Sequence, residues 1–71
     1  MKIVVEAYWD EEAGVWVASA VGDVGLVTEA STIEKLQERI ALVLPDLLAD
    51  EHAGPYEVEL ITHSYQVVAA E

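Results

Sequence analysis

The sequence predicts an α+β domain in which an antiparallel β-sheet of three to four strands carries one amphipathic helix on one face. Three observations predict it. Strand-like alternation fills the first third of the chain, one long segment has helical spacing, and Gly- and Asp-rich turns separate the segments. The expected order is strand, strand, strand, helix, strand. A length of 71 residues has room for one domain, which we place at residues 1–71.

The first twenty residues predict an antiparallel hairpin. Residues 2–9 and 15–20 are rich in β-branched and aromatic side chains, and the short polar turn 10–14 joins them. One face of the first strand carries Ile3, Val5 and Ala7, and the other carries Val4, Glu6 and Tyr8. The second strand is apolar at nearly every position, so both of its faces need cover.

A third strand at 26–30 leads into a helix expected from Thr32 to about Asp50. Ser31 and Glu34 have the spacing of a capping box, with Ser31 as the N-cap. The apolar residues that recur at helical spacing are Ile33, Leu36, Ile40, Val43, Leu44, Leu47 and Leu48. Pro45 lacks an amide hydrogen, and its ring crowds the carbonyl of Ala41, so we expect a kink or a short break there.

The last strand is expected from Tyr56 to about Val68. Val58 and Leu60 alternate with acidic residues, and the alternation changes phase beyond Thr62, which indicates a bulge or a strand end. Whether residues 66–71 form an exchanged strand is left open by the sequence.

The apolar content exceeds what one thin core can bury. Hydrophobic residues make up 54% of the chain and the mean hydropathy is +0.30, although a domain this short leaves much of its surface in water. The helix covers one sheet face, and no other predicted element covers the second. We therefore expect an interface that includes Val4, Tyr8 and Trp16, and a homo-oligomer, either a dimer or a tetramer.

The charge narrows the kinds of partner. Fourteen Asp and Glu residues against three Lys and Arg residues give a net charge of −11. Phosphate backbones repel such a surface, which argues against direct nucleic-acid binding, whereas a basic protein is attracted. The alternative is that the acidic surface serves solubility alone. No signal peptide or membrane-spanning run is apparent, and there is no cysteine, so we expect a cytoplasmic protein without disulfides.

We predict no catalytic residue, no metal site and no cofactor. Asp10, Glu11 and Glu12 lack the glycine spacing of a calcium loop and are expected to form a solvated turn. His52 and His63 have no metal-ligand spacing. The strand acids Glu6, Glu57 and Glu59 could form a nuclease-like cluster, but no basic residue accompanies them. We expect them to be exposed acids that discourage edge pairing.

Three segments resemble small bacterial proteins of the HicB-like fold. They are Tyr8–Ala18 (YWDEEAGVWVA), Gly25–Glu34 (GLVTEASTIE) and Leu44–Leu48 (LPDLL), and the last resembles a stand-alone subfamily classed as a domain of unknown function. One departure is the turn at residues 21–25, which lacks the proline that family members often have there.

The resemblance implies a degenerate ribonuclease-H-like sheet without catalytic carboxylates. HicB proteins are antitoxins that bind HicA, a small basic ribonuclease, and mask its catalytic histidine; they commonly form dimers or tetramers. The resemblance therefore implies a non-catalytic module that neutralises a HicA-like ribonuclease. The alternative is a self-associating structural or regulatory domain with no toxin partner.

Overall fold

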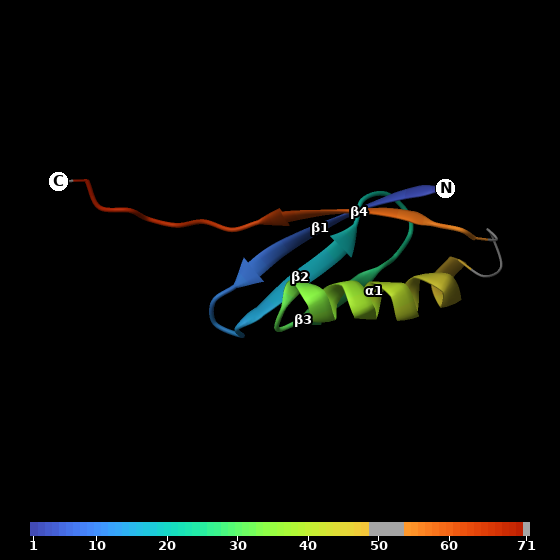
Figure 1. Ribbon diagram of the computed structural model, residues 1–71, viewed down its shortest axis with the longest axis horizontal. Helices are drawn as coiled ribbons and strands as arrows, with labels where there is room; N and C mark the ends of the chain where they lie inside the picture. The colour runs from blue at the N-terminus through green and yellow to red at the C-terminus, as the bar shows by residue number, and fades with distance from the viewer. Residues whose placement is uncertain (49–53, 71) are drawn as a thin grey trace.

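The protein is one mixed β-sheet with one helix against one of its faces (Figure 1). This computed structural model describes residues 1–48 and 54–70. The elements are β1 (Lys2–Asp10), β2 (Val15–Ala20), β3 (Val27–Ala30), α1 (Ile33–Leu48) and β4 (Glu57–His63). The sheet order is β3-β2-β1-β4. The predicted α+β class and the predicted order of elements are confirmed.

The β1–β2 hairpin forms as expected, and its turn is held by Asp10. The Asp10 carboxylate oxygen Oδ1 accepts hydrogen bonds from the backbone N–H groups of Glu12 at 3.0 Å and Ala13 at 3.2 Å. The N–H of Gly14 donates to the Asp10 carbonyl at 2.8 Å. Gly14 has φ +67°, a left-handed conformation that glycine adopts without steric cost. The acidic turn therefore has a structural role in ending β1 and starting β2.

The sheet is mixed and not antiparallel as predicted, because β4 pairs parallel with β1 whereas the other two pairings are antiparallel. The helix explains this direction: α1 carries the chain back across the sheet from the end of β3, so that β4 starts beside the start of β1. Parallel neighbours require such a crossover. β4 ends at His63, earlier than the predicted end near Val68 and close to the change of phase at Thr62.

The helix begins one residue later than the capping-box prediction requires. The Thr32 hydroxyl accepts a hydrogen bond from the N–H of Lys35 at 3.1 Å, and the Thr32 carbonyl accepts one from Leu36 at 2.9 Å. Thr32 is therefore the N-cap, and the prediction for Ser31 is wrong. The third helical position is consequently Lys35 rather than Glu34, so the reciprocal bond of a capping box is not available.

α1 buries a stripe with a four-residue repeat, Leu36, Ile40, Leu44 and Leu48. It runs without a break through Pro45, so of the expected kink or short break the break does not occur. Pro45 is exposed and lies in the last turn, while the leucines at 44 and 48 stay buried, so packing holds that turn in place. The predicted helix end near Asp50 falls outside the described residues. Within residues 1–48 and 54–70, no helix is both long and apolar enough to span a membrane.

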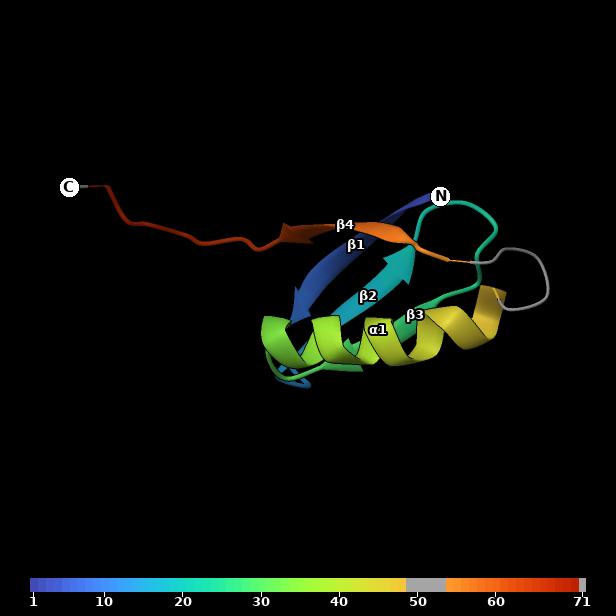
Figure 2. The ribbon, with the colours of Figure 1, turned by 45° about the vertical axis from the view of Figure 1, so that its right-hand side comes forward.

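The core lies between α1 and the sheet face that carries Ile3, Val5 and Ala7, as the alternation in β1 predicted. Ala18, Leu26 and Ala30 complete it from β2, β3 and the loop between them. The helix lies over the β2–β3 half of the sheet, and β1 and β4 extend beyond it (Figure 2). Residues 64–70 continue from β4 as an extended segment that leaves the body of the domain (Figure 1).

Candidate protein-binding face

No element within residues 1–48 and 54–70 covers the sheet face opposite α1, and we call it the open face. Strand register defines its members, because residues paired across strands point to the same face. Tyr8 pairs with Val17 and His63, Val4 with Glu59, and Glu6 with Ser19 and Ile61. The apolar and aromatic residues of the open face are Val4, Tyr8, Val15, Val17, Val27 and Ile61.

Three of these six apolar side chains are exposed to solvent. Val27 is 72% exposed, Tyr8 45% and Ile61 37%, whereas Val4, Val15 and Val17 are half-buried between their neighbours. They extend across all four strands from β3 to β4. An apolar surface that crosses a whole sheet is typical of a contact face for another macromolecule.

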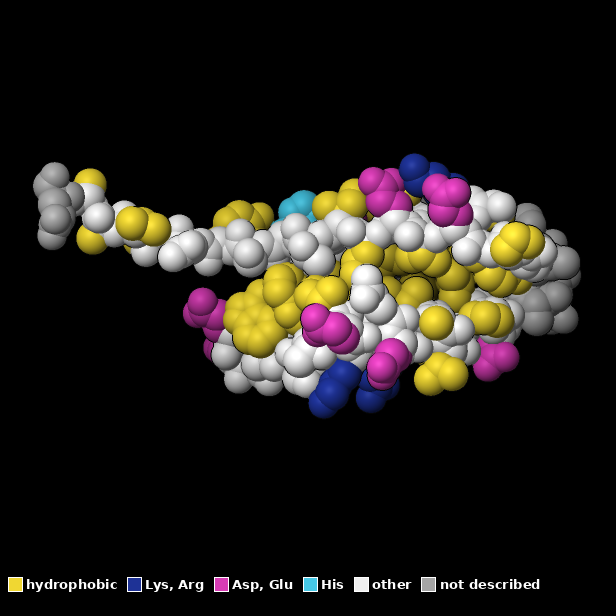
Figure 3. All heavy atoms as spheres, in the orientation of Figure 1, with side chains coloured by type: hydrophobic (Ala, Val, Ile, Leu, Met, Phe, Trp, Pro, Cys, Tyr) yellow, Lys and Arg dark blue, Asp and Glu magenta, His cyan; other side chains and the backbone are white. Residues whose placement is uncertain are grey.

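Carboxylates surround the apolar residues of this face. They are Glu6, Asp10, Glu29, Glu57 and Glu59. Lys2 is the cation on this face, and its Nζ lies 3.1 Å from Oε1 of Glu59, so it is already paired. Figure 3 shows acidic and basic side chains side by side along the rim above β4. Both partners of this ion pair are about half exposed, so it adds little stability.

Glu6, Tyr8 and His63 form a cluster on the open face. The Tyr8 hydroxyl donates a hydrogen bond to Oε2 of Glu6 at 3.0 Å. The rings of Tyr8 and His63 stack with centroids 4.5 Å apart and an angle of 8° between their planes. This hydrogen bond and the negative charge of Glu6 raise the pKa of Tyr8 above its ordinary value of 10.0.

His63 places its Nε2 against the same carboxylate. Nε2 lies 3.4 Å from Oε2 of Glu6, is shielded from solvent and has no hydrogen-bond partner among residues 1–48 and 54–70. The cluster therefore fixes an aromatic platform at the end of the β1–β4 pairing, with a carboxylate at its edge.

The three predicted contact residues do not share one face. Val4 and Tyr8 lie on the open face, but Trp16 points to the helix side, where it packs against the core. Trp16 meets Trp9 edge to face, with ring centroids 5.4 Å apart and an angle of 62°. The two residues are partners in the hairpin register, so their rings stabilise the hairpin, and Trp16 also extends the core.

Two of the three strand acids considered from the sequence have side-chain partners. Glu6, Glu57 and Glu59 do share the open face, but Glu6 accepts from Tyr8 and Glu59 pairs with Lys2. No group of three or more His, Cys, Asp or Glu side chains suited to a metal ion occurs among residues 1–48 and 54–70. His52 lies outside the described residues.

Sequence reasoning missed the cluster around His63. It treated His63 as a strand residue with no special role, because its neighbours depend on the parallel β1–β4 register. That register places His63 opposite Tyr8 and two positions from Glu6 along β1. The available signal was the His63 position relative to Val58 and Leu60, which places it on the opposite face from those core-side residues.

The fold and the open face define a small α+β domain with one helix, one mixed sheet and an acidic, partly apolar face. The chain belongs to the DUF1902 family, a domain of unknown function whose model matches residues 2–68. It is similar to the hypothetical protein TTHA1013 from the extremely thermophilic bacterium Thermus thermophilus, seen in its crystal structure. The two share 38% sequence identity with a TM-score of 0.78, over 96% of this chain and 100% of that one. No curated protein matches the chain.

Proposed function

We propose that this chain is a non-catalytic module that binds a small basic protein through its open face. The observation that supports this most directly is the composition of that face: apolar side chains across four strands, bordered by five carboxylates, with its one lysine already paired. Apolar contact supplies affinity when water is expelled. The carboxylates attract a basic partner and orient it during the encounter.

The partner class we propose is a small basic ribonuclease of the HicA kind. The resemblance of residues 8–18 and 25–34 to HicB-like antitoxins supports it, as does the net charge of −11. A ribonuclease carries a basic surface for its phosphate substrate. An acidic face that occupies this surface excludes RNA, so binding alone is enough to inhibit cleavage.

A binding role also fits the state of the titratable groups. The carboxylates of the open face lie on a broad sheet surface, and two of them, Glu6 and Glu59, are engaged by neighbouring side chains. A hydrolytic site needs groups that converge on one reacting atom within a pocket. We therefore assign Tyr8 and Glu6 a role in recognition.

The proposal is tested with a purified HicA-like ribonuclease. We expect the wild-type chain to block RNA cleavage at a one-to-one ratio, and calorimetry at low salt to detect the complex. Val17→Lys places a positive charge in the centre of the open face, beside Glu29, and we expect it to weaken binding at least tenfold. Leu42→Lys makes the same change in charge on the exposed side of α1 and serves as the matched control.

Two results contradict the proposal. One is a ribonuclease that forms no complex with the chain at low salt. The other is a Val17→Lys variant that retains its fold by circular dichroism and inhibits as well as Leu42→Lys does.

A second candidate function is a self-associating structural or regulatory module. The observation that favours it is the extended C-terminal segment, in which Tyr65 is 84%, Val67 99% and Val68 75% exposed. Apolar side chains this exposed are stabilised by contact with another copy. A homo-oligomer with no affinity for a basic ribonuclease supports this function over the first.

A further inference from the structure

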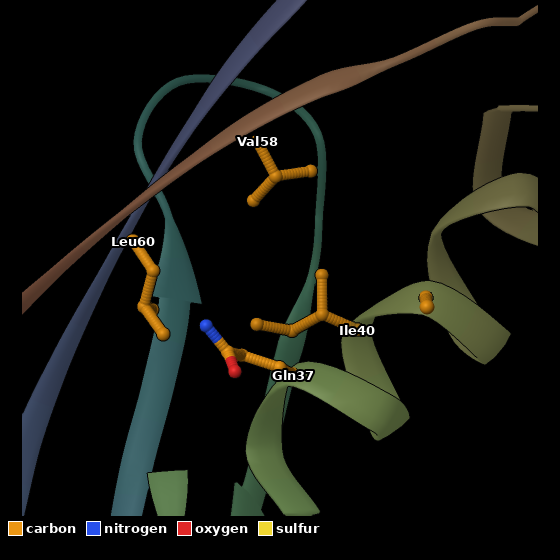
Figure 4. Close-up of a pocket in the computed structure, with 5 residues that line it drawn as sticks. Gln37, Ile40, Val58 and Leu60 are labelled. Carbon is orange, nitrogen blue, oxygen red and sulfur yellow. The ribbon is translucent and has the colours of Figure 1, made fainter. Parts of the chain in front are cut away.

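An apolar groove separates α1 from β4 on the helix side of the sheet. Its lining consists of Gln37, Ile40 and Ala41 from α1, and Val58 and Leu60 from β4, and it encloses about 200 Å³. In Figure 4, Val58 and Leu60 extend from β4 toward Gln37 and Ile40 across the gap. Figure 3 shows hydrophobic side chains along the floor of a hollow between the strand layer and the helix.

The groove exists because the helix lies over the β2–β3 half of the sheet. β1 is still buried on this side, with Ile3, Val5 and Ala7 at 2% exposure or less. β4 lies one strand further out, so its helix-side residues are covered less, and Val58 is 36% exposed. β4 is also an edge strand: it pairs with β1, and no other described strand borders it. Its outer backbone groups are therefore a template for one more strand.

The C-terminal segment 64–70 has the character of a strand without a sheet. It is extended, it has no charged residue, and Val67 is 99% exposed, so it makes almost no contact with its own chain. The radius of gyration is 14.1 Å, compared with about 11 Å expected for a compact chain of this length. The projecting segment visible in Figure 1 accounts for this elongation.

We propose that segment 64–70 of a second copy adds to the free edge of β4 and closes the groove, and that the first copy's segment does the same in return. The result is a two-fold symmetric dimer in which residues 57–70 of the two chains run antiparallel to each other. This assembly uses the edge of β4 and the helix side of the sheet. It is independent of the open face and leaves that face free for another partner.

The lengths agree with this arrangement. β4 has seven residues, and segment 64–70 also has seven. Each β4 can therefore pair with the other copy's segment along its whole length. Seven extended residues span about 23 Å. The sixteen residues of α1 span about 24 Å, so the added strand and the helix are similar in length.

The same segment cannot serve its own β4 in this way. It follows β4 directly, so it would have to reverse direction, and a hairpin turn uses at least about two residues. About five residues would then remain, so a hairpin within one chain would leave about two of the seven β4 positions unpaired. In a second copy the segment arrives from outside and needs no turn.

The side chains of the segment suit the groove. In an extended strand, Tyr65 and Val67 point to one side and Gln66 and Val68 to the other. A valine therefore lies on the same sheet face as Val58 and Leu60 in either phase of pairing. A standard interface of about 1,600 Å² in total requires about 400 Å² from each of the four surfaces in this exchange, two segments and two grooves. That is about 60 Å² per segment residue, an area that a segment this exposed can bury.

The test is the solution mass from light scattering during size-exclusion chromatography. We expect the full chain to have twice the 7.7 kDa of one copy. A chain that ends at Ser64 is expected to be a monomer. Ala41→Glu introduces a charge into the groove and is expected to raise the dimer dissociation constant at least tenfold. Leu42→Glu makes the same change in charge on the next residue, which is 75% exposed and does not line the groove, and is expected to remain dimeric.

Cross-linking between copies tests the contact itself. A photoreactive group at position 67, in a mixture of isotope-labelled and unlabelled chains, is expected to join residue 67 of one copy to the segment around Leu60 or Ala41 of the other. If the shortened chain fails to fold, Ala41→Glu and Leu42→Glu still decide the question.

The proposal is overturned if the full chain is a monomer or if the folded shortened chain is still a dimer. It is also overturned if Ala41→Glu and Leu42→Glu change the dimer dissociation constant equally. Cross-links confined to one copy also overturn it. Val17→Lys, on the open face, is expected to leave the dimer mass unchanged, so failure here is distinct from failure to bind a basic protein.

Discussion

At the residue scale, Glu6 is the side chain that organises the open face. Its carboxylate accepts a hydrogen bond from Tyr8 and lies 3.4 Å from Nε2 of His63, while the Tyr8 and His63 rings stack. Three residues from two parallel strands therefore form one polar and aromatic unit. The unit gives the face a fixed shape before any partner arrives, which lowers the entropic cost of binding.

The hydrogen bond between Tyr8 and Glu6 has a consequence at alkaline pH. It raises the pKa of Tyr8 above 10.0, because ionising the phenol breaks the bond and places two negative charges together. The folded state thus holds this proton more tightly than the unfolded state. The bond favours the folded state below pH 10, and this contribution is lost as the pH rises through the folded pKa.

Ultraviolet titration of tyrosinate measures this effect. We expect a transition above pH 10.0 in the wild type that is absent in Tyr8→Phe and moves down toward 10.0 in Glu6→Gln. A Glu6→Gln variant with an unchanged titration curve would show that Glu6 is not the cause.

Individual residues also show which placements the sequence can predict and which it cannot. The alternation in β1 correctly separated Ile3, Val5 and Ala7 from Val4, Glu6 and Tyr8. Trp16 was placed with Val4 and Tyr8, because nearly every position in the second strand is apolar and alternation cannot tell its faces apart. The His63 contact depends on which strand borders β1 and in which direction, and local sequence does not carry that information.

At the element scale, one side-chain hydrogen bond identifies the residue that caps the start of α1. Ser31 and Thr32 are both good N-cap residues, and sequence favoured Ser31 because Glu34 follows at capping-box spacing. The structure uses Thr32, whose hydroxyl accepts from Lys35 at 3.1 Å. The choice follows from where β3 ends, at Ala30, and from the angle at which the helix must cross the sheet.

Alanine substitution at the two positions separates the alternatives. Thr32→Ala removes the capping acceptor and is expected to lower the free energy of unfolding by about 0.5–2 kcal/mol. Ser31→Ala is expected to change it by less than about 0.5 kcal/mol, because its exposed side chain accepts no helix hydrogen bond in the structure. Urea denaturation measures both, and a larger loss for Ser31→Ala would contradict the assignment.

The direction of β4 was the other feature that local sequence left open. A seven-residue alternating strand reads the same whether its neighbour is parallel or antiparallel. The position of β4 beside β1 follows from the crossover made by α1, and it creates both the Tyr8–His63 contact and the groove between β4 and the helix.

At the scale of the whole molecule, the charge of −11 acts in opposite directions on the two proposed associations. Two identical acidic copies repel each other, and salt screens that repulsion. A basic partner is attracted, and salt screens the attraction. The two associations are therefore separable by ionic strength alone.

Raising the salt concentration from about 0.01 M to 1 M shortens the screening length from about 30 Å to 3 Å. We expect the dimer to dissociate less at high salt, by at least a factor of three, and the complex with the basic ribonuclease to weaken at least tenfold. Sedimentation of the chain alone and with the ribonuclease measures both. A dimer that weakens as salt is added would contradict the apolar exchange of segments 64–70.

The overall architecture was predictable because each element carries a clear pattern: alternation in β1, a four-residue repeat in α1 and glycine turns between strands. The sequence also indicated excess apolar surface. It could not locate that surface in two separate places, the open face and the groove beside β4, because the division depends on how far α1 reaches across the sheet.

The central claim is that the open face binds a basic protein, and amide chemical shifts of the labelled chain test it most directly. The account predicts that adding the basic ribonuclease at low salt shifts the amides of Tyr8, Val17 and Ile61 and leaves those on the exposed side of α1, such as Leu42, unchanged. Shifts confined to α1, or no shifts at all, would contradict it.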